Sequence, residues 1–575
     1  MGPRKAWSSN LFHGLMLHID RLSSRVLAKR ILYASVLLFF IAFIMLPPII
    51  GILSRLTLLR QVLSDPVLMA RASSSIFWSF AVALLVSSLD LLIGIPLAWF
   101  IARGSSRWID VVDALVDIPF IIPTVALGFS TLLFWGSPTS LPSLIGLSEL
   151  SPGLYLVLLL HFAFSFPVVV RVMVGEFLSY ERIYETAART LGARALTVAR
   201  TITLPMLKPG LVAAFLLSFA RSLSETGATM MVAGSFENGA IFIVRAREEG
   251  LEGPMAFVSL ILILASIAAF AIIRILGSRL RFPLQRAWPR IEGILSSQGS
   301  VRARDIAVIL IFAFLVLLPS IFITFPALGA LSDGTLGRAL EGWGAWGNFW
   351  KAMVLSYGIG ILATILNIAT GLPVAILIAR RKLGLFGTVL LDAAVNLPII
   401  VPSVALGASL SFFWRSFGLL PEFWILVLSH ATITYTYFVQ AMAAAIEGLP
   451  EEMEEAARTL GSRPFNIFRH LTLPLTKYSV FSGALLTFTR SINETGAAMA
   501  VSRELKTAPV ILVEWVKGAG SGSGSGSGAG GLSESALGIS FLVLTSFLAL
   551  LALRLLVYRG KRGGRKAGGA FASLR

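Results

Sequence analysis

The feature that most constrains the fold of this chain is a series of long apolar runs. About twelve stretches are apolar over roughly 20 residues or more, the length that a helix needs to cross a bilayer. With 56% hydrophobic residues, a soluble protein is excluded. The sequence therefore predicts an all-α polytopic membrane protein with about 12 transmembrane helices. The predicted spans are 31–53, 75–102, 110–135, 153–174, 210–235, 254–276, 305–328, 350–378, 386–414, 423–446, 479–501 and 536–557.

The charge distribution predicts the orientation of these spans. The chain carries 48 Lys and Arg against 30 Asp and Glu, a formal net charge of +18. If the N-terminus is cytoplasmic, most of the cations fall on the cytoplasmic side, as the positive-inside rule requires. We therefore predict a multi-pass protein of the cell (plasma) membrane with both termini in the cytoplasm. The basicity needs no nucleic-acid partner.

The order of motifs in the first half of the chain recurs in the second half. Asp117–Gly128 (DIPFIIPTVALG) corresponds to Asn396–Gly407 (NLPIIVPSVALG), and the prolines in both should interrupt regular helix geometry. Phe219–Thr229 (FARSLSETGAT) corresponds to Phe488–Ala498 (FTRSINETGAA). Six spans per repeat give both halves the same orientation, related by an axis along the membrane normal with a path between them.

These repeats predict two tandem six-helix units with short additions. The predicted division is a cytoplasmic lead 1–30, a first six-span repeat 31–276, a basic cytoplasmic linker 277–304, a second six-span repeat 305–557 and a basic cytoplasmic tail 558–575. The second repeat contains a Gly/Ser-rich external loop at 518–531, whose composition is typical of a flexible spacer.

A polar segment between the apolar runs is also repeated. Arg182–Pro205 and Glu451–Pro474 are identical at 12 of 24 positions, at a constant offset of 269. Each has an acidic first turn, two alanines, a glycine where a helix should stop and a closing proline. These residues are Glu185, Ala187, Ala188, Gly192 and Pro205 in the first copy, and Glu454, Glu455, Ala456, Ala457, Gly461 and Pro474 in the second. Such a short helix fits a groove on another protein; the alternative is an ordinary solvated loop helix.

The second copy resembles the signature of permeases of binding-protein-dependent (type I) ABC importers, E-A-A, three residues, G, nine residues, I-x-L-P. The first copy departs from it at Thr186, and the second has Leu471 in place of Ile. The resemblance implies that both segments are coupling helices that dock on two ABC ATPase subunits, with an external solute-binding protein delivering a small solute. This chain has no G-x-x-x-x-G-K-[ST] phosphate loop, so ATP would be bound by the partner subunits and the chain needs no cofactor of its own.

Charged residues within the predicted spans are the candidates for the translocation path. Arg221 and Glu225 are four residues apart, as are Arg490 and Glu494, so each pair should share one helix face. Charges at membrane depth usually face a bundle interior or an aqueous cavity. These residues, with Gly227 and Gly496 beside them, either line or gate a path or form structural ion pairs. For His161 and His430 we expect a structural role, packed between helices.

The substrate class rests on resemblance alone. Ser224–Gly234 (SETGATMMVAG) looks like the fifth-span segment of molybdate, tungstate and sulfate permeases, whereas fusion of two halves resembles ferric-iron and thiamine permeases. A small oxyanion is favoured because the span sequence lies closer to the path. An ion-coupled secondary transporter is a remote alternative that leaves the repeated polar segment unexplained. No metal-ligand or nucleophile motif indicates an enzyme.

Overall fold

The computed structural model describes residues 20–104, 106–138, 140–279, 289–418, 420–520, 531–549 and 551. Within these ranges the regular structure is helical and no strand occurs, so the all-α prediction is confirmed. Residues 1–19 of the predicted lead, 521–530 of the Gly/Ser loop and the whole predicted tail 558–575 lie outside the described residues.

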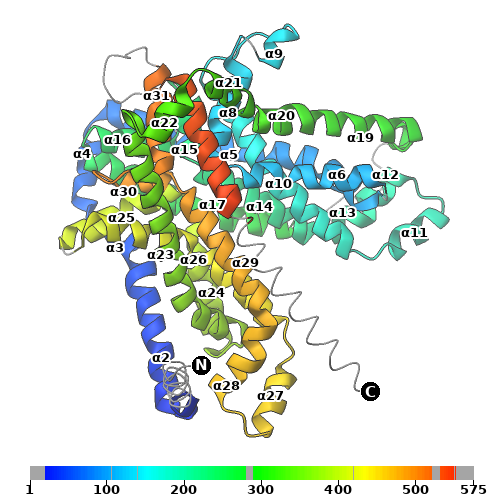
Figure 1. Cartoon of the computed structure of the whole chain (residues 1–575). Coiled ribbons are helices and arrows are strands. Elements are labelled where there is room, and N and C mark those ends of the chain that lie inside the picture. The colour runs from blue at the N-terminus through cyan, green and yellow to red at the C-terminus, as the bar shows by residue number, and fades with distance from the viewer. Residues whose placement is uncertain are drawn as a thin grey trace, which may run out of the picture.

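Each half of the chain is organised around a long helix that packs along a second one. In the first half α5 (Pro66–Arg103) packs along α10 (Leu154–Ser179). In the second half α23 (Ala345–Ala379) packs along α26 (Glu422–Glu447) in the same way. The order of elements that recurs in the sequence therefore produces the same local packing twice (Figure 1).

The first apolar helix of each half packs on the other half. The N-terminal arm runs through α2 (Val26–Phe39), a π-helical turn and α3 (Leu46–Leu53). Its Phe40 ring lies 5.3 Å from that of Tyr435, and Phe43 lies 5.6 Å from Trp414. This exchange interlocks the two halves.

The equivalent arm of the second half packs on the first half. It runs through α19 (Gln298–Phe312), a second π-helical turn and α20 (Leu318–Ile321). Phe314 lies 5.9 Å from Phe134, and the Ser130 hydroxyl donates a hydrogen bond to the Pro319 carbonyl. Each half is therefore completed by a helix that belongs, in sequence, to the other half.

Proline bends the third helix of each half, as the sequence predicts. In the first half α8 (Thr124–Gly136) begins after Pro123, and the chain turns by 105° at this point. In the second half α24 (Gly384–Ile400) and α25 (Ser403–Phe417) meet at 107°, with Pro402 at the N-cap. A proline lacks a backbone N–H, so the helix stops before it and restarts in a new direction.

The fifth span of each half is not the continuous helix that the sequence predicts. In the first half α14 (Lys208–Ser224) ends before α15 (Gly227–Val232) begins. In the second half α29 (Leu473–Ile492) and α30 (Gly496–Val501) are separated in the same way. Apolar composition alone did not indicate these breaks.

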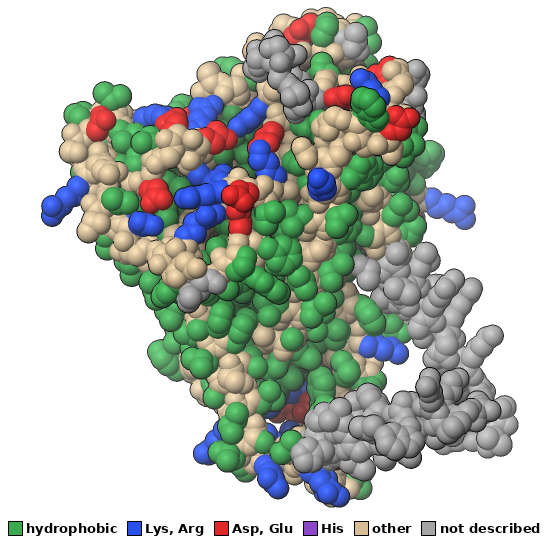
Figure 2. Space-filling model, turned by 60° about the vertical axis from the view of Figure 1, so that its left-hand side comes forward, with side chains coloured by type: hydrophobic (Ala, Val, Ile, Leu, Met, Phe, Trp, Pro, Cys, Tyr) green, Lys and Arg blue, Asp and Glu red, His purple; other side chains and the backbone are tan. Residues whose placement is uncertain are grey.

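The number of spans supported by length and composition is lower than the predicted twelve. Among the described residues, seven helices are long and apolar enough to cross a membrane, and the number rises to ten if three bent pairs each count as one span. The two remaining predicted spans, 423–446 and 479–501, coincide with α26 and with α29–α30, which carry more polar residues. Figure 2 shows a broad apolar surface between charged side chains at the two ends of the molecule.

Candidate coupling segments and translocation path

Both repeated polar segments form a short helix that ends at a left-handed glycine. These helices are α11 (Ile183–Thr190) and α27 (Glu451–Thr459). Gly192 has φ +85° and Gly461 has φ +81°, a conformation that glycine adopts without steric cost. The predicted helix stops are therefore confirmed.

Backbone hydrogen bonds close both ends in the same way. The N–H of Ser462 donates to the carbonyl of Ala457 (3.0 Å), and the N–H of Ala193 donates to that of Ala188 (3.0 Å). This six-residue closure is the Schellman arrangement of a helix C-terminus. The second alanine of each motif thus supplies the carbonyl that the stop requires. Pro205 and Pro474 come later, directly after a π-helical turn, and each is the second residue of the α-helix that resumes there.

The two helices expose most of their surface. Neither has a buried residue, and the leucine that follows each helix, Leu191 or Leu460, is 89% or 86% exposed. In Figure 1, α11 and α27 lie at the tips of the molecule, away from its central helices. An exposed leucine beside an exposed alanine face is a surface suited to contact with another protein.

One acidic residue in the first turn of each helix forms an ion pair with the transmembrane bundle. Glu185 forms an ion pair with Arg103 (2.6 Å) and accepts a hydrogen bond from the Thr203 hydroxyl. Glu454 forms an ion pair with Arg380 (2.8 Å). Arg103 is the last residue of α5 and Arg380 directly follows α23, so each pair anchors the repeated polar segment to the long helix of its half. The repeated tripeptide Ile-Ala-Arg (101–103 and 378–380) was the sequence signal for this contact.

The chain that precedes each exchanged arm braces the coupling segment of the half on which the arm packs. The hydroxyl oxygen of Ser23 accepts a hydrogen bond from the N–H of Phe465 (3.1 Å). The hydroxyl oxygen of Ser296 accepts one from the N–H of Leu196 (3.1 Å). Leu196 and Phe465 are equivalent by the offset of 269, and each is the second residue of a short helix, so each serine caps that helix from another segment.

An ion pair reinforces each brace. In the first segment Glu292 pairs with Arg200 (2.9 Å) and accepts a hydrogen bond from Thr197. In the second segment Asp20 lies 3.6 Å from Arg463. Sequence reasoning missed these residues. The signal that could have found them is the tripeptide Leu-Ser-Ser, at 22–24 and again at 295–297, ahead of each first span.

The breaks in the two fifth spans carry the predicted path residues. Each break is followed by a short helix whose N-terminus is capped by a glutamate. The N–H of Ala228 donates to Glu225 (3.1 Å), and the N–H of Ala497 donates to Glu494 (3.1 Å). All four groups are buried. The carboxylates thus bind helix N-termini, where negative charge is favourable.

The two breaks face each other across the boundary between the halves. A Cβ placed on Gly227 would lie 2.6 Å from the Cβ of Thr495, and one on Gly496 would lie 2.8 Å from the hydroxyl oxygen of Thr226. Both distances are shorter than non-bonded atoms tolerate, so each glycine permits the other half to approach. The structure therefore brings the predicted glycines together at the centre of the molecule.

The predicted ion pairs form in only one half. Arg490 pairs with Glu494 at 2.7 Å. No ion pair joins Arg221 to Glu225 among the described residues, although α14 continues to Ser224 whereas α29 already ends at Ile492. Arg221 instead lies over the Phe164 ring, 5.5 Å from its centroid, and donates to the Phe164 carbonyl. Of the two interpretations left open, the structural ion pair therefore describes the second half and not the first.

The two buried histidines pack between helices, as their positions indicated. The ring nitrogens of His161 lie 2.8 Å from the Ser222 hydroxyl and 2.9 Å from the Thr229 hydroxyl. His430 lies 3.0 Å from the hydroxyl and the carbonyl of Ser491. No group of three or more potential metal-ligating side chains occurs in the part of the chain that the structure describes.

The structure thus consists of two interlocked helical halves, each with an exposed polar segment and a break in its fifth span. The chain matches the family described as "Binding-protein-dependent transport system inner membrane component" over residues 94–282 and again over residues 371–559. These two matches cover more than half of the sequence, so the chain belongs to this family and contains its domain twice. It is a transport permease and not an enzyme.

Several curated permeases are similar to part of the chain. The molybdenum transport system permease protein ModB of Escherichia coli (strain K12) is 30% identical over 188 residues, which are 81% of ModB and 30% of this chain. The molybdate/tungstate transport system permease protein WtpB of Methanocaldococcus jannaschii is 32% identical over 232 residues, 90% of its length and 40% of this chain. The sulfate transport system permease protein CysT of Salmonella typhimurium is 29% identical over 266 residues, 93% of its length and 44% of this chain.

Proposed function

We propose that this chain forms the complete translocation path of an ATP-driven importer of a small oxyanion, with both permease halves in one polypeptide. The halves are 31–276 and 305–557, joined by the linker 277–304. The observation that carries the proposal is the pair of exposed coupling segments, each anchored to its bundle by a partly buried Arg–Glu pair. Two equivalent docking surfaces fit two ATPase subunits.

The proposed mechanism moves the two halves as rigid bodies. ATP-driven closure of the ATPase subunits draws α11 and α27 together on the cytoplasmic side. Because Arg103 and Arg380 connect these helices to α5 and α23, the movement passes directly into the long helices of each bundle. The facing breaks at Thr226–Gly227 and Thr495–Gly496 act as the gate, since they close the boundary between the halves at its centre. Their separation opens the path.

The proposed substrate class rests on the printed names of the relatives and on the fifth-span sequence. All the relatives named above are molybdenum, molybdate/tungstate or sulfate permeases. A small oxyanion delivered by an external binding protein is therefore favoured over ferric iron or thiamine.

The test is reconstitution of the chain in proteoliposomes with its ATPase and binding protein, followed by measurement of ATP hydrolysis. Binding protein loaded with molybdate, tungstate or sulfate should stimulate hydrolysis several-fold over the unloaded protein. Stimulation that occurs only with iron or thiamine would overturn the substrate class.

The docking role is tested by placing a charge on the exposed leucine that follows α27. Leu460→Glu should abolish stimulated ATP hydrolysis while leaving the thermal unfolding temperature unchanged, because the side chain is 86% exposed. The matched control is Leu340→Glu, which changes a leucine that is 70% exposed on α22 (Thr335–Glu341), outside both coupling segments. Equal activity of the two variants would remove the docking role.

A further inference from the structure

A polar cavity of about 760 Å³ lies between the two halves, at the end of the molecule opposite the second coupling segment. Its walls come from α16 (Gly239–Glu248) and the start of α17 (Glu252–Arg279) in the first half, and from α25 and α30 in the second. Glu422, the first residue of α26, also lines it, whereas the last residue of that helix lies four positions before α27.

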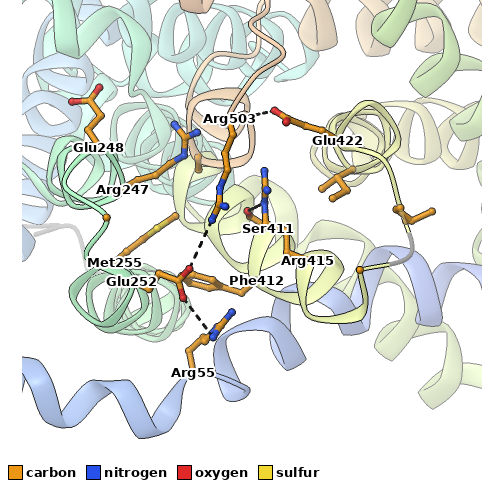
Figure 3. Close-up of a pocket in the computed structure, with 15 residues that line it drawn as sticks. Arg55, Arg247, Glu248, Glu252, Met255, Ser411, Phe412, Arg415, Glu422 and Arg503 are labelled. Atoms are coloured by element: carbon orange, nitrogen blue, oxygen red, sulfur yellow. Dashed lines mark hydrogen bonds and ion pairs between the residues drawn. The ribbon is translucent and has the colours of Figure 1, made fainter.

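Four arginines from four different elements line this cavity, which is called the arginine pocket below. They are Arg55, Arg247, Arg415 and Arg503 (Figure 3). Segments that are far apart in the chain thus converge their guanidinium groups on one space.

The carboxylates of the arginine pocket do not neutralise all four cations. Glu252 is shared by two of them, at 3.5 Å from Arg55 and 3.9 Å from Arg503. Glu422 accepts hydrogen bonds from the backbone N–H groups of residues 503 to 505. Glu248 lies 3.8 Å from Lys517 and, in Figure 3, its carboxylate lies away from the arginine side chains.

Two of the arginines have no carboxylate partner among the described residues. The Arg415 guanidinium donates to the Ser411 hydroxyl (3.0 Å) and the Val501 carbonyl (2.8 Å), both neutral. Arg247 is half-buried, and no ion pair or hydrogen bond of its side chain is seen in the described part of the chain. Burial lowers the pKa of Arg247 and the nearby Arg415 and Arg503 lower it further, whereas the charges of Glu422 and Glu248 act in the opposite direction. Clustered cations of this kind are stabilised when an anion binds between them.

The charge of the pocket is not repeated, although the fold is. By the alignment of the two halves, Gly136, Gly234 and Val516 occupy the positions equivalent to Arg415, Arg503 and Arg247. The repeat therefore explains the walls of the cavity but not its charge. In Figure 2 the face that carries α16 and α25 shows Lys and Arg side chains directly above the apolar surface.

We propose that the arginine pocket binds a tetrahedral oxyanion group. Guanidinium groups donate paired hydrogen bonds to such groups with good geometry. Arg247 and Arg415 are the two arginines of the pocket that form no ion pair among the described residues, so they can bind an oxyanion group. The group belongs either to a free oxyanion or to the phosphate of an anionic lipid head group at the edge of the apolar surface. The free-oxyanion form rests on the substrate class proposed above, whereas the lipid form does not.

The test measures binding to the purified full-length chain alone, with no ATPase or binding protein. Equilibrium binding of radiolabelled sulfate and of tungstate is measured in nanodiscs of phosphatidylcholine only. Retained phosphatidylglycerol is measured by native mass spectrometry after purification from mixed lipid. Arg247→Ala should weaken one of these two interactions about tenfold or more, as expected for loss of a charged hydrogen-bond donor. Arg247→Lys should keep part of the affinity.

The control variant is Arg60→Ala, which removes an exposed arginine a few residues from Arg55 and outside the pocket. It should change either affinity less than about twofold. An effect on oxyanion binding assigns the site to a free anion, and an effect on retained lipid assigns it to a head group. If Arg247→Ala and Arg415→Lys both fold, as thermal unfolding reports, and neither interaction changes, the proposal is wrong. Substrate-stimulated ATP hydrolysis is measured separately, so failure of the pocket and failure of the proposed transport function are distinguishable.

Discussion

The two coupling segments share one backbone but present different surfaces. Both have a short helix, a left-handed glycine and an inward glutamate paired with an arginine. Their outward faces are only partly alike. The exposed Leu191 of the first segment is repeated as Leu460 in the second. Thr186, in contrast, stands where the second segment has Glu455, and both of these side chains are exposed. The shape, the anchor and the exposed leucine are therefore repeated, whereas other parts of the outward face differ.

The braces of the two segments differ more than the segments themselves. Glu292 is buried and pairs with Arg200 at 2.9 Å, while Asp20 is 3.6 Å from the more exposed Arg463. The serine caps are equal in length, at 3.1 Å. Buried pairs depend more strongly on both partners than exposed pairs do. The first segment is therefore expected to be held more firmly than the second.

The largest expected effect comes from removing the arginine anchors. Arg380→Ala leaves the carboxylate of Glu454 with only the exposed Arg458 at 3.5 Å, and should lower the free energy of unfolding by about 2–3 kcal/mol. Arg103→Ala should have a similar effect, because Glu185 is held in the same geometry. Denaturant unfolding of the purified protein measures both.

A double-mutant cycle with Glu454→Ala is the control for this prediction. If the pair acts as an anchor, the double variant should be less destabilised than the sum of the single variants. Additive effects in the second half together with coupling in the first would show that only one segment is anchored through its arginine.

A smaller effect is expected at the glycines that end the coupling helices. Gly461→Val should disturb the left-handed turn, because the conformational free energy of valine at this φ is higher by about 1–2 kcal/mol. The protein should still fold and insert, but uptake should be lost. No atom lies within 4 Å of the position of a new Cβ, so the effect is conformational and not steric. Gly192→Val should be milder, because its segment departs from the coupling motif at Thr186.

Gly461→Asn separates conformation from side-chain size, since asparagine tolerates positive φ better than valine does. Transport assays in vesicles should show that this variant keeps most of its activity. Full transport by Gly461→Val would contradict a role of the turn in coupling.

The smallest effect is expected from the serine braces. Ser23→Ala removes the cap of the second segment. It should lower the free energy of local opening, measured by amide hydrogen exchange at Phe465, by about 1 kcal/mol. Ser296→Ala should raise exchange at Leu196 less, because the buried Glu292–Arg200 pair still holds that segment. Ser24→Ala, whose hydroxyl donates only to the nearby Arg21 carbonyl, is the matched control. A larger effect at Leu196 than at Phe465 would reverse the proposed order of firmness.

The sequence by itself determined the features that depend on neighbouring residues. Run length predicted membrane helices, Pro123 and Pro402 predicted interrupted helices, and Gly192 and Gly461 predicted helix stops. The constant offset of 269 predicted two equivalent halves, which the two family matches confirm. Each of these features follows from backbone geometry within a few residues or from direct comparison of one segment with another.

Only the tertiary structure decided how the halves meet. The exchange of the first spans, the braces of Ser23 and Ser296 and the facing Gly227 and Gly496 join segments that are far apart in the chain. The tertiary structure also decided that Arg490 pairs with Glu494 whereas Arg221 lies over the Phe164 ring, although the spacing of arginine and glutamate is the same in both halves. Local patterns fix which face of a helix is apolar. They do not fix which distant helix covers it, because that choice depends on shape and charge complementarity between complete surfaces.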